Sequence, residues 1–434
     1  MKKRGLMKTR NKLRGLFFTG LLLVLFSGLA FAQEPAGYIV KLKEPLEMML
    51  FSADEVIEEV PYLENIYVID DLSMIEGLYE EGLIDYVEEN GILECLDDEL
   101  LADPQEESSV ALELQEGFVQ DPVASWNLTM CGYEDLQEQG LNGDGVTVAI
   151  IDSGFDIEHE DLQNVKISPY SRNLLGDGTH PESWMRDQKG HGTFVGSLIA
   201  AETGNGVGIA SLADQAELMI LRVVSTHCNR FPYDAACDSG SGTVAKVASA
   251  ICYAADHGAD VINISMGAAD VSYSATLQSA VDYAKEQGII VVVAAGNGGG
   301  SALYYPAACD GVIGVGAVDS YGIRWSFSQH NSSVDTVAPG HQVMGIDIYP
   351  NGAAYTEGTI SSTYTEGSGT SYAAPIVSAF AALAKQVCPD LDHDGFLMLL
   401  AEGGEDKGID GRGDYYGYGL LKGAALIEFL LEES

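Results

Sequence analysis

A serine, a histidine and an aspartate, widely separated in this chain, each stand in a segment of small residues. Ser371 precedes apolar residues at helical spacing, His191 opens a small-residue run after a glycine-rich loop, and Asp152 ends an apolar segment. Nucleophilic attack by a serine needs a base to take its proton and a carboxylate to hold that base. Asn297 adds an amide that could donate to an oxyanion. Together these residues predict acyl transfer.

Each residue also has a plainer interpretation. Ser371 could be the N-cap of a buried helix, and Asp152 and Asn297 could be turn residues. The positions of the residues in the expected fold favour chemistry. In parallel α/β sheets ligands bind beyond the carboxyl ends of the strands, and Asp152 and Asn297 both follow apolar segments of the kind that form such strands.

The elements that must position these residues alternate along the second part of the chain. Short apolar segments between longer runs with helical spacing indicate an α/β fold with a parallel sheet. Glycine just past a helix is a common stop signal, and Gly258 and Gly288 supply it here. We expect helices at 243–257 and 277–287, and strands at 146–151, 218–224, 261–264, 289–295 and 312–315.

Three motifs make a family resemblance specific. Asp152-Ser153-Gly154, His191-Gly192-Thr193 and the segment 369–375 resemble the signature motifs of the subtilisin-like serine proteases (subtilases), in the family's order. The resemblance covers residues 121–434. It implies a mostly parallel central sheet with helices on both faces. It also implies that Asp152 orients His191, that His191 is base and then acid for Ser371, and that Asn297 with the Ser371 N–H binds the oxyanion.

Further segments resemble the family's substrate-binding elements. The segment 261–267 is similar to the strand that lines the first specificity pocket, and 238–242 is similar to the edge that pairs with substrate backbone. The binding residues implied are Gly240, Ser241, Gly242, Ser265, Met266 and Gly267. Gly267 and Gly296 leave room for a sizeable apolar side chain. Phe194 stands where the family often has histidine, and Tyr372 where methionine is usual, without loss of a catalytic atom.

Residues 1–32 read as a secretory signal peptide. A basic start is followed by the apolar stretch 16–29 and by Ala30-Phe31-Ala32, a small-x-small cleavage site. A signal anchor is the alternative, since the apolar stretch approaches the length of a membrane span. No other stretch is long and apolar enough to span. The sequence thus predicts a secreted, extracellular protein without a membrane span once the signal is removed.

Residues 33–96 form a small predicted α+β unit. We expect strands at 38–42, 65–69, 84–87 and 92–93, a helix at 54–60, and a helix at 73–79 capped by Ser73. This unit resembles, more weakly, the subtilase propeptide, which implies an inhibitor carried by the chain itself. Residues 97–120 are acidic and aperiodic, as in an exposed linker, and are the predicted processing region before a catalytic domain at 121–434.

The charge composition limits the classes of molecule that the chain can bind. With 22 Lys and Arg against 65 Asp and Glu, the net charge is -43, which excludes nucleic acid and leaves protein or peptide substrates. Of seven cysteines, Cys228 and Cys237 form the expected disulfide if one exists, while Cys252 and Cys309 suit burial as small apolar residues.

No cofactor is expected to be required, and no metal ligands are assigned. The segment 390–395 matches the start of a calcium loop, but position 401 is alanine instead of the bidentate acid, which favours an aspartate N-cap. Structural calcium elsewhere stays open, with no ligands identified.

Two functions compete. The first is a self-processing serine endopeptidase, and the second is a catalytically silent subtilase scaffold that binds or signals. Labelling by a reactive-serine phosphonate, abolished by Ser371→Ala, separates them. A lipase or esterase would need Gly-x-Ser-x-Gly and the order Ser, Asp, His, and the chain has neither.

Overall fold

The computed structural model describes residues 37–43, 57–96, 125–175, 183–185, 187, 189–224, 241–269, 271, 273–348, 363–405, 407 and 411–433. The predicted signal peptide, the predicted linker, Cys228, Cys237 and Gly240 lie outside the described residues. The chain divides into two compact units, Met1–Ile92 and Leu93–Ser434. Within the described parts, no helix has both the length and the apolar character needed to cross a bilayer.

In the residues that the structure describes, the first unit is an antiparallel sheet with one helix. The sheet order is β2 (Ile57–Glu59), β3 (Ile66–Ile69), β1 (Tyr38–Leu42), β4 (Ile84–Glu89), and the helix is α2 (Leu72–Glu81). Its core is built from one face of the sheet and the apolar side of the helix, with Val40, Ile69 and Ile75 buried.

Two predictions for this unit were wrong. Ile57–Glu59 is a strand paired with β3, not part of a helix, because pairing with a neighbouring strand outweighs weak local helix preference. The helix cap is Asp71, whose carboxylate accepts from the backbone N–H of Ser73 at 2.7 Å, so Ser73 lies inside the helix. The strands expected at 38–42, 65–69 and 84–87 are confirmed, with small shifts at their ends.

The second unit is built on a mostly parallel sheet with helices on both faces. Its strands, in spatial order, are β18 (Gly404–Glu405), β19 (Leu420–Leu421), β15 (Thr336–Pro339), β14 (Ile313–Val318), β13 (Ile290–Ala294), β11 (Val261–Ile264), β6 (Thr147–Asp152), β9 (Glu217–Arg222) and β7 (Lys166–Ile167), with β8 (Arg172–Asn173) also on β9. Only β18 and β19 pair antiparallel among these described strands.

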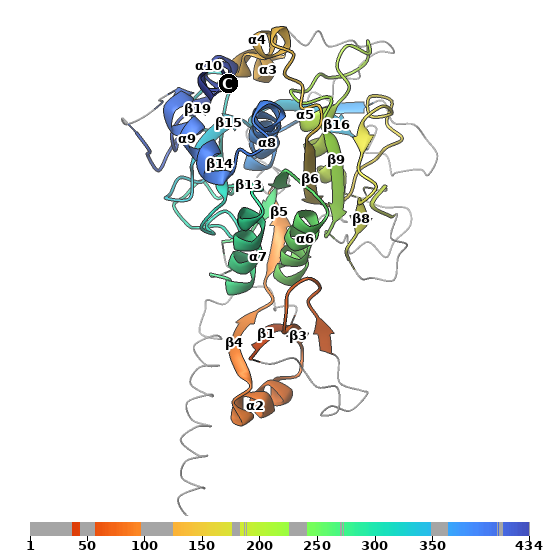
Figure 1. The fold of residues 1–434 in the computed structure, drawn as a ribbon, viewed down its shortest axis with the longest axis vertical. Coiled ribbons are helices and arrows are strands. Elements are labelled where there is room, and N and C mark those ends of the chain that lie inside the picture. Colours follow the sequence, from red (N-terminus) through yellow and green to blue (C-terminus); the bar gives the residue numbers. More distant parts are fainter. Residues whose placement is uncertain are drawn as a thin grey trace, which may run out of the picture. The chain divides into compact units, whose positions relative to one another are not determined.

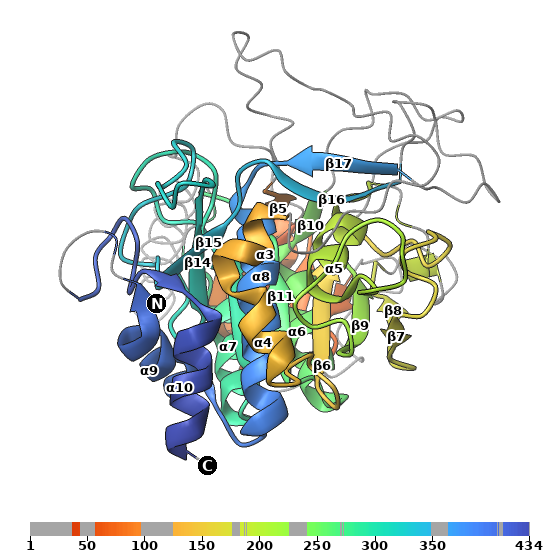
Figure 2. The ribbon, with the colours of Figure 1, turned by 90° about the horizontal axis from the view of Figure 1, so that it is seen from above.

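Helices cover the sheet as the sequence predicts. Figure 1 shows α6 (Val244–Asp256) and α7 (Ala275–Glu286) on one side of it and α8 (Thr370–Val387) on the other. The remaining helices are α3 (Trp126–Cys131), α4 (Tyr133–Glu138), α5 (His191–Ala200), α9 (His393–Gly403), α10 (Gly423–Glu433) and the short η3 (Ser183–Met185). Helix α5 packs on α8 and β6, and α4 and α10 lie beside α8 (Figure 2).

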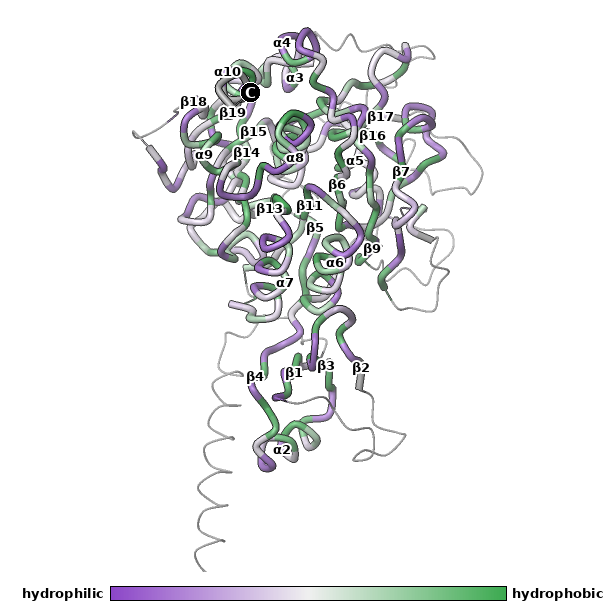
Figure 3. Tube along the Cα trace, in the orientation of Figure 1, coloured by the Kyte–Doolittle hydropathy of each residue, from purple (hydrophilic) through white to green (hydrophobic). Residues whose placement is uncertain are grey.

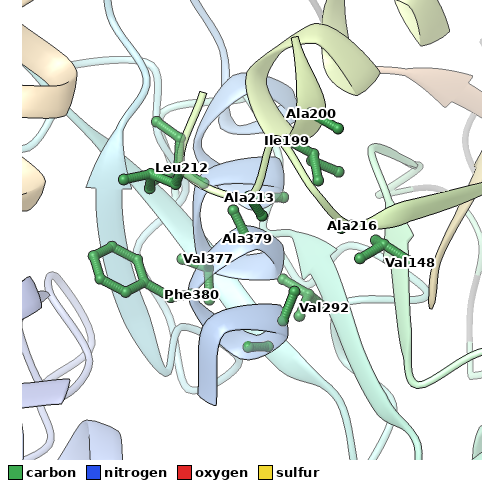
Figure 4. Packing of buried hydrophobic residues seen from close by; sticks show 14 of the residues in the cluster. Val148, Ile199, Ala200, Leu212, Ala213, Ala216, Val292, Val377, Ala379 and Phe380 are labelled. Atoms are coloured by element: carbon green, nitrogen blue, oxygen red, sulfur yellow. The ribbon is translucent and has the colours of Figure 1, made fainter. Parts of the chain in front are cut away.

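The core explains why α8 runs through the middle of this unit. The central strands are largely hydrophobic along their length (Figure 3), as strands buried on both faces must be. Val377 and Phe380 of α8 pack in one cluster with Ile199 of α5 and Val292 of β13 (Figure 4). Small residues such as Ala379 let the helix approach the sheet closely.

The strands predicted at 146–151, 218–224, 261–264, 289–295 and 312–315, and both predicted helices, are confirmed. Helix α8 begins at Thr370 and contains a proline, Pro375, in its second turn.

Smaller strands complete the unit. A hairpin is formed by β16 (Val343–Asp347) and β17 (Thr363–Gly367), and β16 packs against α5. A separate three-stranded sheet contains β10 (Ser241–Thr243), β5 (Ile92–Cys95) and β12 (Met266–Gly267), with β5 in the middle.

Candidate active site

Asp152 and His191 form a buried pair at the end of the central sheet. Asp152 is the last residue of β6, and His191 is the first residue of α5. The imidazole Nδ1 lies 2.8 and 3.0 Å from the two carboxylate oxygens, and the Asp152 carboxylate also accepts from the Ser153 N–H at 2.7 Å. With Nδ1–H donated to Asp152, Nε2 is left as the nitrogen that can accept a proton.

A second buried carboxylate, Asp187, fixes the start of α5. It accepts from the backbone N–H groups of Gly190 and Thr193, each at 2.8 Å, and from the Thr193 hydroxyl at 2.7 Å. It also accepts from Ser153 Oγ at 2.8 Å, and that hydroxyl accepts from the Gly192 N–H. Sequence reasoning missed Asp187. Its only signal was an acid shortly before a helix start, where negative charge is favoured.

Ser371 is the second residue of α8 and is fully buried. Its hydroxyl donates to the backbone carbonyl of Ser265 at 2.9 Å, while Ser265 Oγ donates to the carbonyl of Ser371, also at 2.9 Å. His191 Nε2 has no hydrogen-bond partner among the described residues. The three residues expected to act together are therefore gathered here, but the bond from serine to histidine is not made in this conformation.

The proline in α8 explains why the Ser371 carbonyl accepts its hydrogen bond from Ser265 Oγ. Pro375 has no N–H, so the carbonyl four residues earlier, that of Ser371, lacks its helical donor. Ser265 Oγ takes that place. Ser265 Oγ in turn accepts from Asn263 Nδ2 at 3.0 Å, and the side-chain Oδ1 of Asn263 accepts from Ser378 Oγ at 2.9 Å. A buried chain of hydrogen bonds thus ties the start of α8 to the end of β11.

Asn297 follows β13 and is held by the residue before the serine. Its Oδ1 accepts from the Thr370 N–H at 2.9 Å and from the Thr370 hydroxyl at 2.8 Å. This leaves Nδ2 to donate, and it does so to the backbone carbonyl of Leu96 at 2.8 Å. The carbonyl of Leu96 therefore occupies the position expected for an oxyanion.

Leu93–Leu96 belongs to the second unit and lies in its site, with residues 93–95 in strand β5 and Leu96 directly after it. Cys95 pairs with Met266 and Glu94 with Gly267, and the Leu96 N–H donates to the Ser265 carbonyl at 3.2 Å. Leu93 and Leu96 are 0% and 7% exposed. A Cβ built on Gly267 would lie 3.6 Å from Leu96 Cδ1, so this glycine borders the leucine side chain.

The remaining predicted binding residues lie around this strand. Ser241 and Gly242 belong to β10, on the opposite side of β5 from β12. The expectation that Gly296 leaves space for substrate was wrong, because a Cβ there would lie 2.6 Å from the ring of Tyr304, which already fills that space.

The charge of Asp152 changes the pKa of His191. Burial alone would lower the pKa of His191, but the Asp152 carboxylate, with the Cys95 thiol beside it, raises that pKa well above its ordinary value.

Away from the site, burial raises the pKa of Asp161 to about 7, although its oxygens accept from Asn205 Nδ2 and the Ile209 N–H.

The possible metal ligands are limited. Among the described residues, the group of His, Cys, Asp and Glu close enough to hold an ion is Cys95, Asp152 and His191. The segment 390–395 behaves as expected for a helix cap: the Asp392 carboxylate accepts from the Gly395 N–H at 2.9 Å, and α9 begins at His393.

Comparisons with known proteins identify a family and several proteins to which this chain is similar. A family model described as the subtilase family matches residues 143–419. The thermophilic serine proteinase of Bacillus sp. (strain AK1) is 38% identical over 278 residues, 64% of this chain but only 60% of that relative's length. M-protease of Shouchella clausii (strain KSM-K16) is 31% identical, covering 84% of this chain and 87% of the relative. Thermitase of Thermoactinomyces vulgaris is 34% identical, covering 66% and 90%.

Proposed function

The chain belongs to the subtilase family of serine endopeptidases, and on that premise we propose that it is a secreted, self-processing enzyme that cuts peptide bonds through an acyl-enzyme on Ser371. The observation that carries this proposal is the Leu96 carbonyl held by Asn297 Nδ2 at 2.8 Å beside the buried serine. A peptide carbonyl in that position is placed as the carbonyl of a substrate would be.

The mechanism follows from the hydrogen bonds. Asp152 holds Nδ1–H of His191, so Nε2 is the base. Ser371 Oγ turns from the Ser265 carbonyl to His191, loses its proton and attacks the peptide carbon. Negative charge then develops on the carbonyl oxygen, where Asn297 Nδ2 and the Ser371 N–H stabilise it, since N–H groups in the first turn have no partner within the helix.

The second half of the reaction reuses the same groups. Protonated His191 gives its proton to the leaving amine, and the N-terminal part of the substrate stays on Ser371 as an ester. Water, deprotonated by His191, then hydrolyses the ester and restores the serine. The Asp152 carboxylate stabilises the imidazolium in both halves, in line with the raised pKa of His191.

Self-processing is proposed at the bond after Leu96. Leu96, the residue after β5, presents its carbonyl to Asn297, which points to cleavage between Leu96 and Asp97, at the start of the expected processing region. The N-terminal unit would then be the removable inhibitor. A leucine side chain at this position also supports a preference for substrates with an apolar residue before the cut.

The experiment expresses wild type and Ser371→Ala in a host without other exported proteases and reads N-termini by mass spectrometry. Wild type should yield a domain beginning at Asp97, and Ser371→Ala an uncut chain beginning near Gln33 after signal removal. The same cut in both proteins would mean that another protease makes it. A wild-type start well beyond Asp97 would refute the assignment of Leu96.

A silent scaffold is the alternative function, and a phosphonate that labels reactive serines separates the two. The processed protein should be labelled, and Ser371→Ala should not. A mixed peptide library tests the substrate range; cleavage mainly after Lys or Arg would overturn the proposed apolar preference.

A further inference from the structure

The thiol of Cys95 lies beside the catalytic histidine. Cys95 Sγ, one ring nitrogen of His191 and one carboxylate oxygen of Asp152 are all within 4.8 Å of one another. The three residues are 5%, 3% and 0% exposed, so their charges act on one another with little screening by solvent. Tyr372 of α8 also faces the imidazole, with 5.9 Å between the ring centroids. Asp152 and His191 serve the proposed reaction, but that reaction gives the thiol no part.

The backbone of β5 holds Cys95 in this place. Cys95 pairs with Met266 of β12, and the next residue, Leu96, accepts a hydrogen bond from Asn297 Nδ2 at 2.8 Å. Neighbouring side chains of a strand point to opposite faces, so the side chain of Glu94 points away from the face on which the thiol lies. In the uncut chain, Cys95 is therefore fixed at the imidazole by contacts on both sides of its own backbone.

The thiol and the serine hydroxyl have access to the same base. Nδ1–H of His191 is donated to Asp152, so Nε2 is the ring nitrogen that can accept a proton. Ser371 Oγ does not use it, because it donates to the Ser265 carbonyl at 2.9 Å. A thiol loses its proton far more readily than an alcohol, most of all beside a positively charged histidine. Burial opposes a charged imidazole, but the Asp152 carboxylate and then the Cys95 side chain raise the pKa of His191.

We propose that Cys95 inhibits the first cut from within the chain, because its thiol transfers a proton to Nε2 of His191 and the resulting thiolate and imidazolium stabilise each other. The S–H bond breaks as the N–H bond forms, so the step needs no other reactant. An imidazolium cannot accept the proton of Ser371, and the serine stays inactive until His191 is neutral again. This inference rests on the proposed self-processing, in which Cys95 leaves with the N-terminal piece and the mature enzyme no longer contains the thiol.

The pH dependence of the first cut tests the proposal. Full-length precursor is diluted from denaturant into buffers of different pH, and the cut is timed by mass spectrometry. At about pH 6 the cut should be about tenfold faster in Cys95→Ala than in wild type, because more of His191 is neutral, and the two rates should converge at alkaline pH. Cys95→Ser should behave like Cys95→Ala, since a hydroxyl is too weak an acid to protonate the imidazole.

Glu94→Gln is the matched control, because it changes the same strand on its other face and should keep the wild-type profile. Residues 94 and 95 both precede the proposed cut, so all these precursors yield the same mature enzyme, and any difference in rate belongs to the uncut chain. Equal rates in wild type and Cys95→Ala would overturn the proposal. A cut as slow in Cys95→Ser as in wild type would also overturn it, since the thiol would then not act as an acid.

A second measurement needs no cleavage. In the uncut Ser371→Ala precursor, the pKa of His191 is read from the NMR shifts of its ring as pH is varied. Adding Cys95→Ala or Cys95→Ser should lower that pKa, and an unchanged pKa would refute the proton transfer. A lowered pKa, together with precursors that keep Ser371 and are never cut at any pH, would refute self-processing and leave the pairing of thiol and imidazole standing.

Discussion

Ser265 offers the sharpest test of how the nucleophile is positioned. Ser265→Ala removes the hydroxyl that donates to the Ser371 carbonyl and accepts from Asn263 Nδ2. Both groups are buried, and each unsatisfied buried group costs about 1–3 kcal/mol. We expect the free energy of unfolding to fall by about 2–6 kcal/mol, and kcat to fall about tenfold for each 1.4 kcal/mol lost in the transition state.

Pro375 makes this test a double-mutant cycle. In the Ser265→Ala background, Pro375→Ala supplies the missing N–H to the Ser371 carbonyl and should recover one of the two lost hydrogen bonds, about 1–3 kcal/mol. In the wild-type background the Ser371 carbonyl already has a donor, so Pro375→Ala should add little to the free energy of unfolding.

Stability is measured by denaturant unfolding in a Ser371→Ala background, which prevents self-digestion, and kcat on a peptide amide with Ser371 intact. Ser378→Ala is a matched control, because it removes one buried hydroxyl from the same chain without touching Ser371. Strictly additive effects of Ser265→Ala and Pro375→Ala would refute the explanation that the proline frees this carbonyl for Ser265.

Three other changes probe the site and its surroundings. Asn297→Ala should lower kcat about 10²–10³-fold with little change in KM, a figure taken from the same substitution type in subtilisin; near-normal kcat would reject its oxyanion role. Asp152→Asn should lower kcat and move the acid limb of the pH–rate profile to lower pH, because burial then lowers the pKa of His191 without the carboxylate to raise it; an unmoved limb would show that another group titrates. Asp161 has a folded pKa of about 7 against 3.8, so the folded state holds a proton that the unfolded chain has lost, and unfolding free energy should fall between about pH 4 and 7 by up to about 4 kcal/mol. Asp161→Asn should lack this slope in thermal or urea unfolding, and an identical slope in wild type and Asp161→Asn would rule out Asp161 as its source.

Sequence patterns predicted the sheet and identified the candidate catalytic residues, because both rest on local signals. Buried parallel strands need continuous apolar residues, and Asp152 and Asn297 follow such strands directly. Ile57–Glu59 was predicted wrongly because its strand exists only through pairing with β3.

The partners of Ser371 escaped prediction for a similar reason. Its hydrogen bonds reach Ser265, more than a hundred residues away in the chain. The position of Leu96 against Asn297 is also set by long-range pairing, since β5 has no local signal for β10 or β12 as neighbours.

The central place of β5 between β10 and β12 has a consequence for what the mature enzyme can digest. If the proposed self-processing removes that strand, two facing edges present unpaired backbone N–H and C=O groups, and a new extended chain satisfies them whatever its side chains. The mature enzyme would then select its substrates first by their conformation. A target must give up several consecutive residues to a stretched, fully extended state, which helices and compact domains resist. Unfolded tails and denatured proteins would be consumed quickly, while well-folded neighbours in the same medium would survive.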